Sequence, residues 1–307
     1  MRIELRCIPC LFDDINGALE VLGATAAQKQ RVLEQCIRHL ARHIDILEPP
    51  SYSITAFHRI LKEELGIAEP FMDLRAACNS AGTVIAGRVM ADAQKLEGFE
   101  RFKFLVRWAI AGNYLDFRVV GAGYTIDAGA IEKTLRTRFE YDLSIDDTEH
   151  IYHAIQQARH IVYIPDNVGE LAFDRLLIHE LADATGKRIT VPMRSAPMTS
   201  DATLDDARTL ALAHHGVSII NSGPDTLGIS FTELSLEARN AFADADLIIA
   251  KGQANYYVFS EYGAQYPAAT IVSLFTTKCE CVAEHWNLPR HSSIATILQA
   301  PLGAHTL

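Results

Sequence analysis

The chain has 307 residues and a formal net charge of −10, from 28 basic and 38 acidic side chains. This length suits one large domain or two ordinary ones. The acidic balance argues against a nucleic-acid-binding protein, which usually carries a basic excess, but it does not exclude an anionic small molecule as ligand. The sequence shows no signal-peptide pattern and no apolar run long enough to span a bilayer. We therefore expect a cytoplasmic protein with no membrane partner; nothing in the sequence indicates the oligomeric state.

The first part of the chain has the spacing of helices. Apolar residues recur at intervals of three and four over residues 28–47, which indicates one buried helix face. Residues 53–66 read as a helix that begins at a serine and stops at Gly66, and 71–96 and 99–112 also indicate helices. Strand-like alternation is not evident before about residue 140. We therefore expect a helical cap domain over residues 1–138.

After residue 149 the pattern changes to strands that alternate with helices. Short apolar runs, each preceded by a helical segment, predict strands at 160–165, 188–193, 217–221, 246–250 and 269–275. Strands that alternate with helices form a parallel sheet covered on both faces, and such strands are near-continuous apolar runs. We expect an α/β domain over residues 139–307, with three layers and a doubly wound, mostly parallel sheet.

Polar residues follow each predicted strand, where ligands bind in an open α/β sheet. In chain order these are Asp166 and Asn167, then Asp201, then Ser222 and Gly223, then Lys251 and Asn255, and finally Lys278. If the sheet is doubly wound, these strand ends converge on one site.

The residue types suggest the chemistry of that site. Carboxylate and amide oxygens suit Mg²⁺ or Mn²⁺, and such a metal can activate a water and neutralise phosphoryl charge. The two lysines supply positive charge for phosphate oxygens, while Ser222 and Gly223 allow backbone N–H groups to approach an anion. Phosphoryl transfer needs mainly positioning and charge stabilisation. The plainer alternative is that Asp166 and Asn167 only form a turn and a helix cap.

Two further acidic residues compete for the role of Asp201. Asp205 and Asp206 are placed to favour the N-terminus of a helix through its dipole. Either could replace Asp201 as a metal ligand, although we rank both lower.

Several motifs in this order resemble the DUF89 family, also called the damage-control phosphatase or ARMT1-like family. Asp166-Asn167-Val-Gly-Glu170 is similar to its Asp-Asn-x-Gly-Glu motif, and Gly112-Asn113-Tyr-Leu-Asp116 is similar to its Gly-Asn-x-x-Asp motif. Lys251-Gly-Gln-Ala-Asn255 is similar to Lys-Gly-Gln-Gly-Asn, and Lys278-Cys279 resembles the end of Lys-x-Lys-Cys. The pair Cys7-x-x-Cys10 resembles a mark of the prokaryotic subfamily.

The resemblance implies a metal-dependent phosphatase that hydrolyses small phosphorylated metabolites, such as sugar phosphates or damaged phosphorylated intermediates. It also implies a helical N-terminal domain on a three-layer α/β domain. The implied ligands of the divalent metal (Mg²⁺, Mn²⁺, Co²⁺ or Ni²⁺) are Asp166, Asn167 and Asp201. We assign catalytic roles to Asp166, Lys251 and Glu170, with Glu170 favoured as a base behind the metal ligands over a helix cap. The residues expected to contact substrate are Asn113, Asp116, Ser222, Gly223, Asn255 and Lys278.

This chain departs from the family pattern at three positions, and other functions remain open. Ser200 stands where the family usually has Asn, Ala254 where it has Gly, and Thr276 where the first lysine of Lys-x-Lys-Cys is expected. The last change removes one possible phosphate cation. The alternatives are a non-catalytic module that binds phosphorylated metabolites and, less favoured, a carboxyl methyltransferase that uses S-adenosylmethionine.

The cysteines suggest a second feature. Cys7-x-x-Cys10 has the spacing of half a zinc site, and Cys279-x-Cys281 could supply the other half if the termini meet. A redox role is also open, although the thioredoxin-like context is missing. The plainer alternative is that these cysteines only pack in the core.

Overall fold

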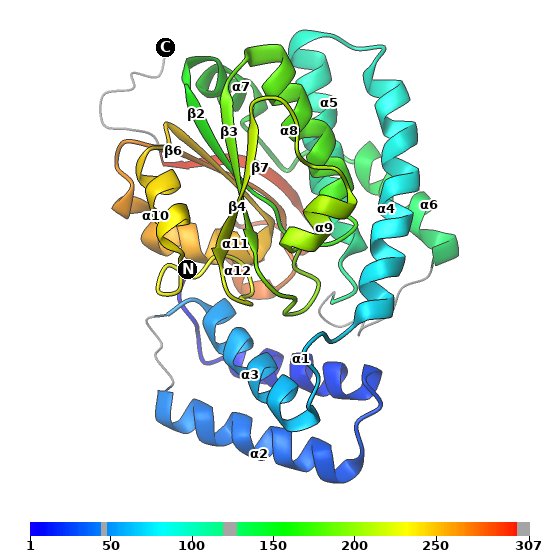
Figure 1. Ribbon diagram of the computed structural model, residues 1–307, viewed down its shortest axis with the longest axis vertical. Helices are drawn as coiled ribbons and strands as arrows, with labels where there is room; N and C mark the ends of the chain where they lie inside the picture. The colour runs from blue at the N-terminus through cyan, green and yellow to red at the C-terminus, as the bar shows by residue number, and fades with distance from the viewer. Residues whose placement is uncertain (44–47, 119–127, 300–307) are drawn as a thin grey trace.

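The computed structural model describes residues 1–43, 48–118 and 128–299 (Figure 1). The helices are α1 (Cys7–Val21), α2 (Ala26–His43), α3 (Pro50–Leu65), α4 (Met72–Ala93), α5 (Gly98–Ala111), η1 (Gly112–Leu115), α6 (Ala128–Glu140), α7 (Thr148–Gln157), α8 (Leu171–Thr185), α9 (Leu204–Thr209), α10 (Leu236–Ala243), α11 (Gly252–Tyr262), η2 (Gly263–Gln265) and α12 (Glu280–His285). The strands are β1 (Ile145–Asp146), β2 (His160–Ile164), β3 (Arg188–Arg194), β4 (Val217–Gly223), β5 (Leu247–Lys251), β6 (Thr270–Thr276) and β7 (Ser293–Gln299). None of these helices is long and apolar enough to cross a membrane.

The strands form a seven-stranded sheet in the order β1-β7-β6-β5-β2-β3-β4. All neighbouring pairs are parallel except β6 and β7, which run antiparallel. The chain leaves β2 toward β3 and β4, then returns to place β5 on the other side of β2. The strand order therefore reverses between β2 and β5, and a crevice at the carboxyl ends of such strands is the usual ligand site of an open sheet.

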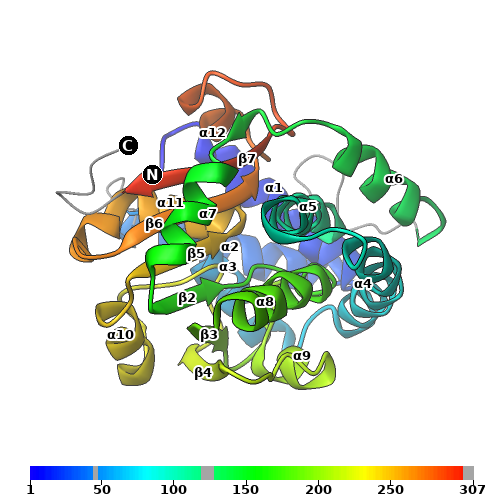
Figure 2. The ribbon, with the colours of Figure 1, turned by 90° about the horizontal axis from the view of Figure 1, so that it is seen from above.

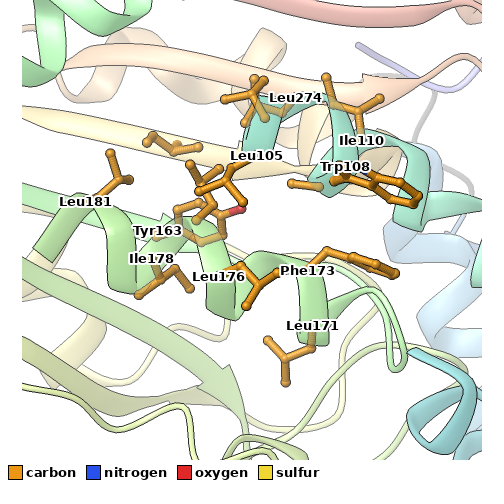
Figure 3. Close-up of a cluster of buried hydrophobic side chains, with 14 of the residues drawn as sticks. Leu105, Trp108, Ile110, Tyr163, Leu171, Phe173, Leu176, Ile178, Leu181 and Leu274 are labelled. Carbon is orange, nitrogen blue, oxygen red and sulfur yellow. The ribbon is translucent and has the colours of Figure 1, made fainter. Parts of the chain in front are cut away.

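The two faces of the sheet are covered by different helices, which confirms the predicted three layers. Residues that alternate along the strands point to opposite faces. On β2, Ile161 and Tyr163 join the core beneath α4, α5 and α8, whereas Val162 and Ile164 join the core beneath α10 and α11. Figure 2 shows these helices on the two sides of the sheet. The packing of Tyr163 among α5 and α8 side chains is shown in Figure 3.

The helices before residue 138 pack in two groups. Helices α1, α2 and α3 lie below the sheet in Figure 1 and surround a core to which Cys78 of α4, Val168 and Cys281 also contribute. Helices α4 and α5 instead pack against α8 and contribute to the core on one face of the sheet. Gly82 of α4 lies so close to Gly169 that a Cβ on Gly82 would sit 2.2 Å from the Gly169 carbonyl oxygen. The division into a helical cap over 1–138 and an α/β domain over 139–307 stays a prediction.

The secondary structure follows the sequence signals with three differences. All five predicted strands are present within two residues of their expected ends, and the described residues before 140 contain no strand. The prediction missed β7, which pairs with β6, and the two-residue strand β1 beside it. The sequence spacing predicts a helix over 204–214, but α9 ends at residue 209; it begins with a capping box in which Thr203 and Asp206 satisfy each other's backbone N–H groups.

Candidate active site

The segments after β2 and β3 are joined by backbone hydrogen bonds at the reversal of strand order. The Ala202 N–H donates to the Asp166 carbonyl at 2.8 Å, and the Val168 N–H donates to the Ser200 carbonyl at 2.8 Å. This short ladder brings Asn167 opposite Asp201. The predicted metal ligands therefore come from two loops that hold each other in register.

Asp166 is confined by the start of α11. Gly252 has φ +78°, a backbone conformation that glycine adopts readily. A Cβ at this position would lie 1.9 Å from Asp166 Oδ2. The glycine that follows Lys251 is thus required both by the left-handed turn and by the carboxylate pressed against it.

An amide–carboxylate network holds Asp166 in place. Its Oδ2 accepts hydrogen bonds from Asn113 Nδ2 at 3.0 Å and from Asn167 Nδ2 at 2.7 Å. The same two amides donate to Glu170 Oε2, at 2.9 and 3.0 Å. Glu170 makes no capping hydrogen bond at the start of α8, so its side chain serves the network and not the helix end.

The two lysines predicted to bind phosphate have different surroundings. Lys251 is fully buried, and its ammonium donates to Glu170, to Asp174 Oδ1 at 2.9 Å and to the Ala109 carbonyl at 2.8 Å. Three acceptors use all three of its N–H bonds. Lys278 instead makes one ion pair, with Asp116 Oδ2 at 2.5 Å. Lys251 therefore holds Glu170, and Lys278 is the lysine that meets the ligand space.

A cavity of about 80 Å³ lies at this junction. Its lining consists of Ile54, Asp116, Arg118, Asp166, Asn167, Leu227, Gln253, Ala254, Tyr257 and Lys278. About 10–15 Å³ of such space is enough to hold one water molecule, so the cavity has room for several water-sized groups. Its polar wall carries carboxylate, amide, guanidinium and ammonium groups together, while Ile54 of α3 closes one side.

The remaining predicted ligand, Asp201, is placed differently from Asp166 and Asn167. It is fully buried and does not line the cavity. Its Oδ1 pairs with Arg194 at 2.7 Å and accepts the Gly228 N–H at 2.9 Å, and its Oδ2 accepts the Thr199 hydroxyl at 3.0 Å.

A hydrogen-bonded hydroxyl links the predicted ligands to the substrate side of the site. Ser200 Oγ lies 2.7 Å from both Asn167 Oδ1 and Asp116 Oδ1, and its single O–H can donate to either of them. Ser200 occupies the position where the family usually has Asn, so this chain makes the link with a hydroxyl.

The chemistry of these residues fits a divalent cation. Asp166 and Asn167 place oxygen donors at the cavity, and Asn113 Oδ1 behind them is a buried acceptor that no described group satisfies. Over residues 1–43, 48–118 and 128–299, no three His, Cys, Asp or Glu side chains are arranged to hold a metal. The predicted ligand set has only two such side chains, because its third member, Asn167, would bind through an amide oxygen.

The surroundings of Asp166 disfavour its ionised form. Burial raises the pKa of Asp166 to about 8, and the carboxylates of Glu170, Asp201 and Asp116 add to the rise against the opposing effect of Lys278. Burial also works against ionisation of Asp116, but Lys278 and a neighbouring guanidinium outweigh it and hold the pKa of Asp116 below its usual range. A cation at this cavity would relieve the repulsion among these carboxylates.

Other predicted residues lie outside the cavity. The N–H of Gly223 on the edge strand β4 donates to Asn221 Oδ1, so it is not free to bind an anion; neither Gly223 nor Ser222 lines the cavity. Asn255 joins two loops by accepting the Ile229 N–H and donating to the Lys251 carbonyl.

The competing acidic residues are also elsewhere. Asp206 pairs with Arg75 at 2.6 Å and caps α9, and Asp205 is exposed beside Arg208. Neither lines the cavity, and their placement agrees with the helix-start alternative.

Six cavity residues are absent from the predicted site: Ile54, Arg118, Leu227, Gln253, Ala254 and Tyr257. The sequence carried partial signals for some of them. Gln253 lies within the Lys-Gly-Gln-Ala-Asn motif, and Tyr257 is one turn further along α11. Arg118 follows Asp116 by two residues, and Ile54 lies in α3, which no motif marks. Gln253 Oε1 accepts the Lys278 N–H at 2.7 Å, so it fixes the backbone of the cavity lysine.

The sequence and the fold match a known family of phosphatases. The family model for the damage-control phosphatase ARMT1-like domain matches residues 3–294, and the chain belongs to this family. A damage-control phosphatase of Archaeoglobus fulgidus is 30% identical over 301 residues, which cover 97% of this chain and all of that protein. A damage-control phosphatase of Pyrococcus horikoshii is 27% identical, with 94% of this chain and 96% of the relative covered.

A solved structure agrees with the sequence matches. The crystal structure of a DUF89 family protein from Pyrococcus horikoshii superimposes with a TM-score of 0.85 and 25% identity, covering 97% of this chain and all of that one. The predicted family and α/β class are therefore confirmed, and the relatives support a phosphatase-type function. The comparisons do not address the cysteine pair as a subfamily mark.

Proposed function

We propose that this protein is a divalent-metal-dependent phosphatase that hydrolyses small phosphorylated metabolites, sugar phosphates among them. The observation that carries the proposal is the cavity in which Asp166, Asn167, Asp116 and Lys278 meet at the reversal of strand order. The family membership of the chain favours phosphate ester hydrolysis over other chemistry of the same residues.

The residues proposed to hold the metal are Asp166 and Asn167 at the cavity; Asp201, the third ligand implied by the family resemblance, pairs with Arg194 outside the cavity and would have to exchange that contact to bind the metal. When bound, the metal supplies charge neutralisation for the phosphoryl group and lowers the pKa of a coordinated water. The chain's own contribution is rigidity, because Asn113 and Glu170 fix the orientation of both cavity ligands.

Lys278 and Arg118 are proposed to receive the phosphoryl oxygens. Lys278 is held by Asp116 and by the Gln253 contact to its backbone, and both cations face the cavity. Phosphoryl transfer is catalysed mainly by such fixed positive charge. Lys251 is proposed not to contact the phosphoryl group; it orients Glu170.

The test is an assay of protein stripped of metal by a chelator, on p-nitrophenyl phosphate and a panel of sugar phosphates. Mg²⁺, Mn²⁺, Co²⁺ and Ni²⁺ are added singly, and phosphate release is measured. We expect at least one metal to restore turnover in the wild type and none to restore it in Asp166→Ala.

The matched control is Asp205→Asn. This carboxylate lies near the same edge of the sheet, but its side chain is 84% exposed and pairs only with Arg208 among the described contacts. It should retain wild-type turnover. Phosphate release by Asp166→Ala at the wild-type rate, or binding of sugar phosphate without hydrolysis under every metal, would contradict the proposal.

A further inference from the structure

Two cysteine-containing segments from opposite ends of the sequence meet in the structure. Cys7 begins α1 and Cys281 lies in α12, 274 positions further along, and their sulfur atoms are 3.9 Å apart. Both side chains are nearly buried, at 9% and 8% exposure, in the core shared by α1, α2 and α3. An ion pair between Arg6 and Glu284 joins the same two segments on the outside.

The other two cysteines of these motifs have different environments. Cys10 is exposed, and the sulfur of Cys279 lies 3.5 Å from both Gln253 Nε2 and the Tyr257 hydroxyl. Among the described residues, no three of these thiols are arranged to hold a metal. The geometry therefore singles out one pair of sulfurs and not a four-ligand site.

We propose that Cys7 and Cys281 are a redox pair whose disulfide joins α1 to α12. The observed separation is a van der Waals contact, and a disulfide bond is about 2.05 Å long. Closing it requires the two sulfurs to approach by roughly 1.9 Å in total, a movement within the reach of rotation about the two Cα–Cβ bonds. The bond would tie α1, and with it α2 and α3, to the segment that follows Lys278.

The chemistry is thiol–disulfide exchange with a low-molecular-weight disulfide as oxidant. One thiolate of the pair attacks a sulfur of the oxidant, whose S–S bond breaks and releases one small thiolate. The second thiolate attacks the protein sulfur of the mixed disulfide and releases the other. Two protein thiols are oxidised, one small disulfide is reduced to two thiols, and the two protons from Cys7 and Cys281 pass to these through solvent.

The surroundings of Cys281 disfavour its thiolate at neutral pH. Burial raises the pKa of Cys281 to about 12, and the nearby Cys7 and Cys279 sulfurs add to the rise. The thiolate is the attacking species, so the rate should rise with pH.

The experiment maps the disulfide directly and needs no measurement of phosphate release. The full-length protein is equilibrated with glutathione disulfide at pH 8.5, free thiols are alkylated, and tryptic peptides are analysed without reduction. Trypsin cuts after Arg6 and Lys278, so Cys7 shares a peptide with Cys10, and Cys279 shares one with Cys281. We expect a cross-link between these two peptides.

Serine variants assign the cross-link to specific residues. The double variant Cys10→Ser/Cys279→Ser leaves the buried pair intact and should form the cross-link fully. Cys7→Ser and Cys281→Ser should each abolish it. Because the bond closes a loop of more than 270 residues, the melting temperature of the oxidised double variant should exceed that of its reduced form by several degrees.

Three outcomes would overturn the proposal. The first is a bond between Cys7 and Cys10, or between Cys279 and Cys281, in place of the link between the two peptides. The second is a double variant that yields only mixed disulfides with glutathione. The third is a protein that carries one zinc per chain, with its thiols protected from alkylation until a chelator is added.

Discussion

Replacing Gly252 by alanine should displace the Asp166 carboxylate and lower catalytic activity by more than the loss of stability explains. A Cβ at residue 252 would stand 1.9 Å from Asp166 Oδ2, and real Cβ contacts below 3.0 Å essentially never occur. The carboxylate oxygen must therefore retreat by about 1.1 Å (3.0 minus 1.9). Misplacing a catalytic group by about 1 Å can cost on the order of 10²-fold in rate, so we expect kcat/KM to fall about 100-fold.

The matched control is Gly186→Ala at the end of α8. Gly186 has φ +63°, close to the +78° of Gly252, but a Cβ there would meet nothing within 4 Å. Both variants place alanine in a left-handed backbone conformation, so each should lose roughly 1–2 kcal/mol of unfolding free energy. Denaturant unfolding checks this loss, and only Gly252→Ala also moves the carboxylate. Equal kcat/KM values for the two variants, in the metal-supplemented phosphatase assay, would refute the argument that Asp166 must be held where it is.

Three further predictions follow from the contacts at the site. Lys278→Met should lower kcat about 10²–10³-fold, as for loss of one charge-stabilising donor; an unchanged kcat in steady-state kinetics would exclude Lys278 as the phosphate cation. Lys251→Met leaves Glu170 and Asp174 buried without their cation, so urea unfolding should show a loss of about 3–5 kcal/mol; a loss below 1 kcal/mol would show that this ion cluster is not structural. Burial and the Glu170 carboxylate raise the pKa of Asp174 to about 6, against the effect of Lys251. A raised carboxyl pKa contributes stability that is present below about pH 4 and lost as pH rises through 6. Wild type should therefore lose stability relative to Asp174→Asn between pH 4 and 6, and parallel curves of unfolding free energy against pH would contradict this.

The sequence predicted the layers and the edge that carries the site because these depend on local patterns. An apolar run identifies a buried parallel strand without any knowledge of which strands lie beside it. The strand-end rule then brought Asp166, Asn167 and Lys278 together at the edge where the cavity lies. The pairing of β7 with β6 is a tertiary choice, and no hairpin-type turn joins them; α12 lies between. The side on which α4 packs depends on the close approach of Gly82 to Gly169, which no helical periodicity encodes.

Within the site, residue type alone could not divide the lysines by role. Lys251 and Lys278 both follow apolar strands, and both match family motifs. Their surroundings distinguish their roles. Lys251 points toward α5 and α8 and pairs with Glu170 and Asp174, whereas Lys278 pairs with Asp116 at the cavity. Residue type also could not reveal the role of Asn255, whose amide hydrogen-bonds to the backbone of Ile229 and Lys251 and not to the cavity.

The contribution of Ile54 to the cavity has a consequence for how such an enzyme diversifies. In the proposed phosphatase, the wall that would meet the phosphoryl group comes from the sheet edge, whereas Ile54 comes from α3. Substitution of Ile54 alone can therefore reshape the space beside the leaving alcohol without altering a charged group. We expect a set of apolar substitutions at Ile54 to redirect preference among phosphate esters while the proposed metal requirement and the pH profile stay fixed.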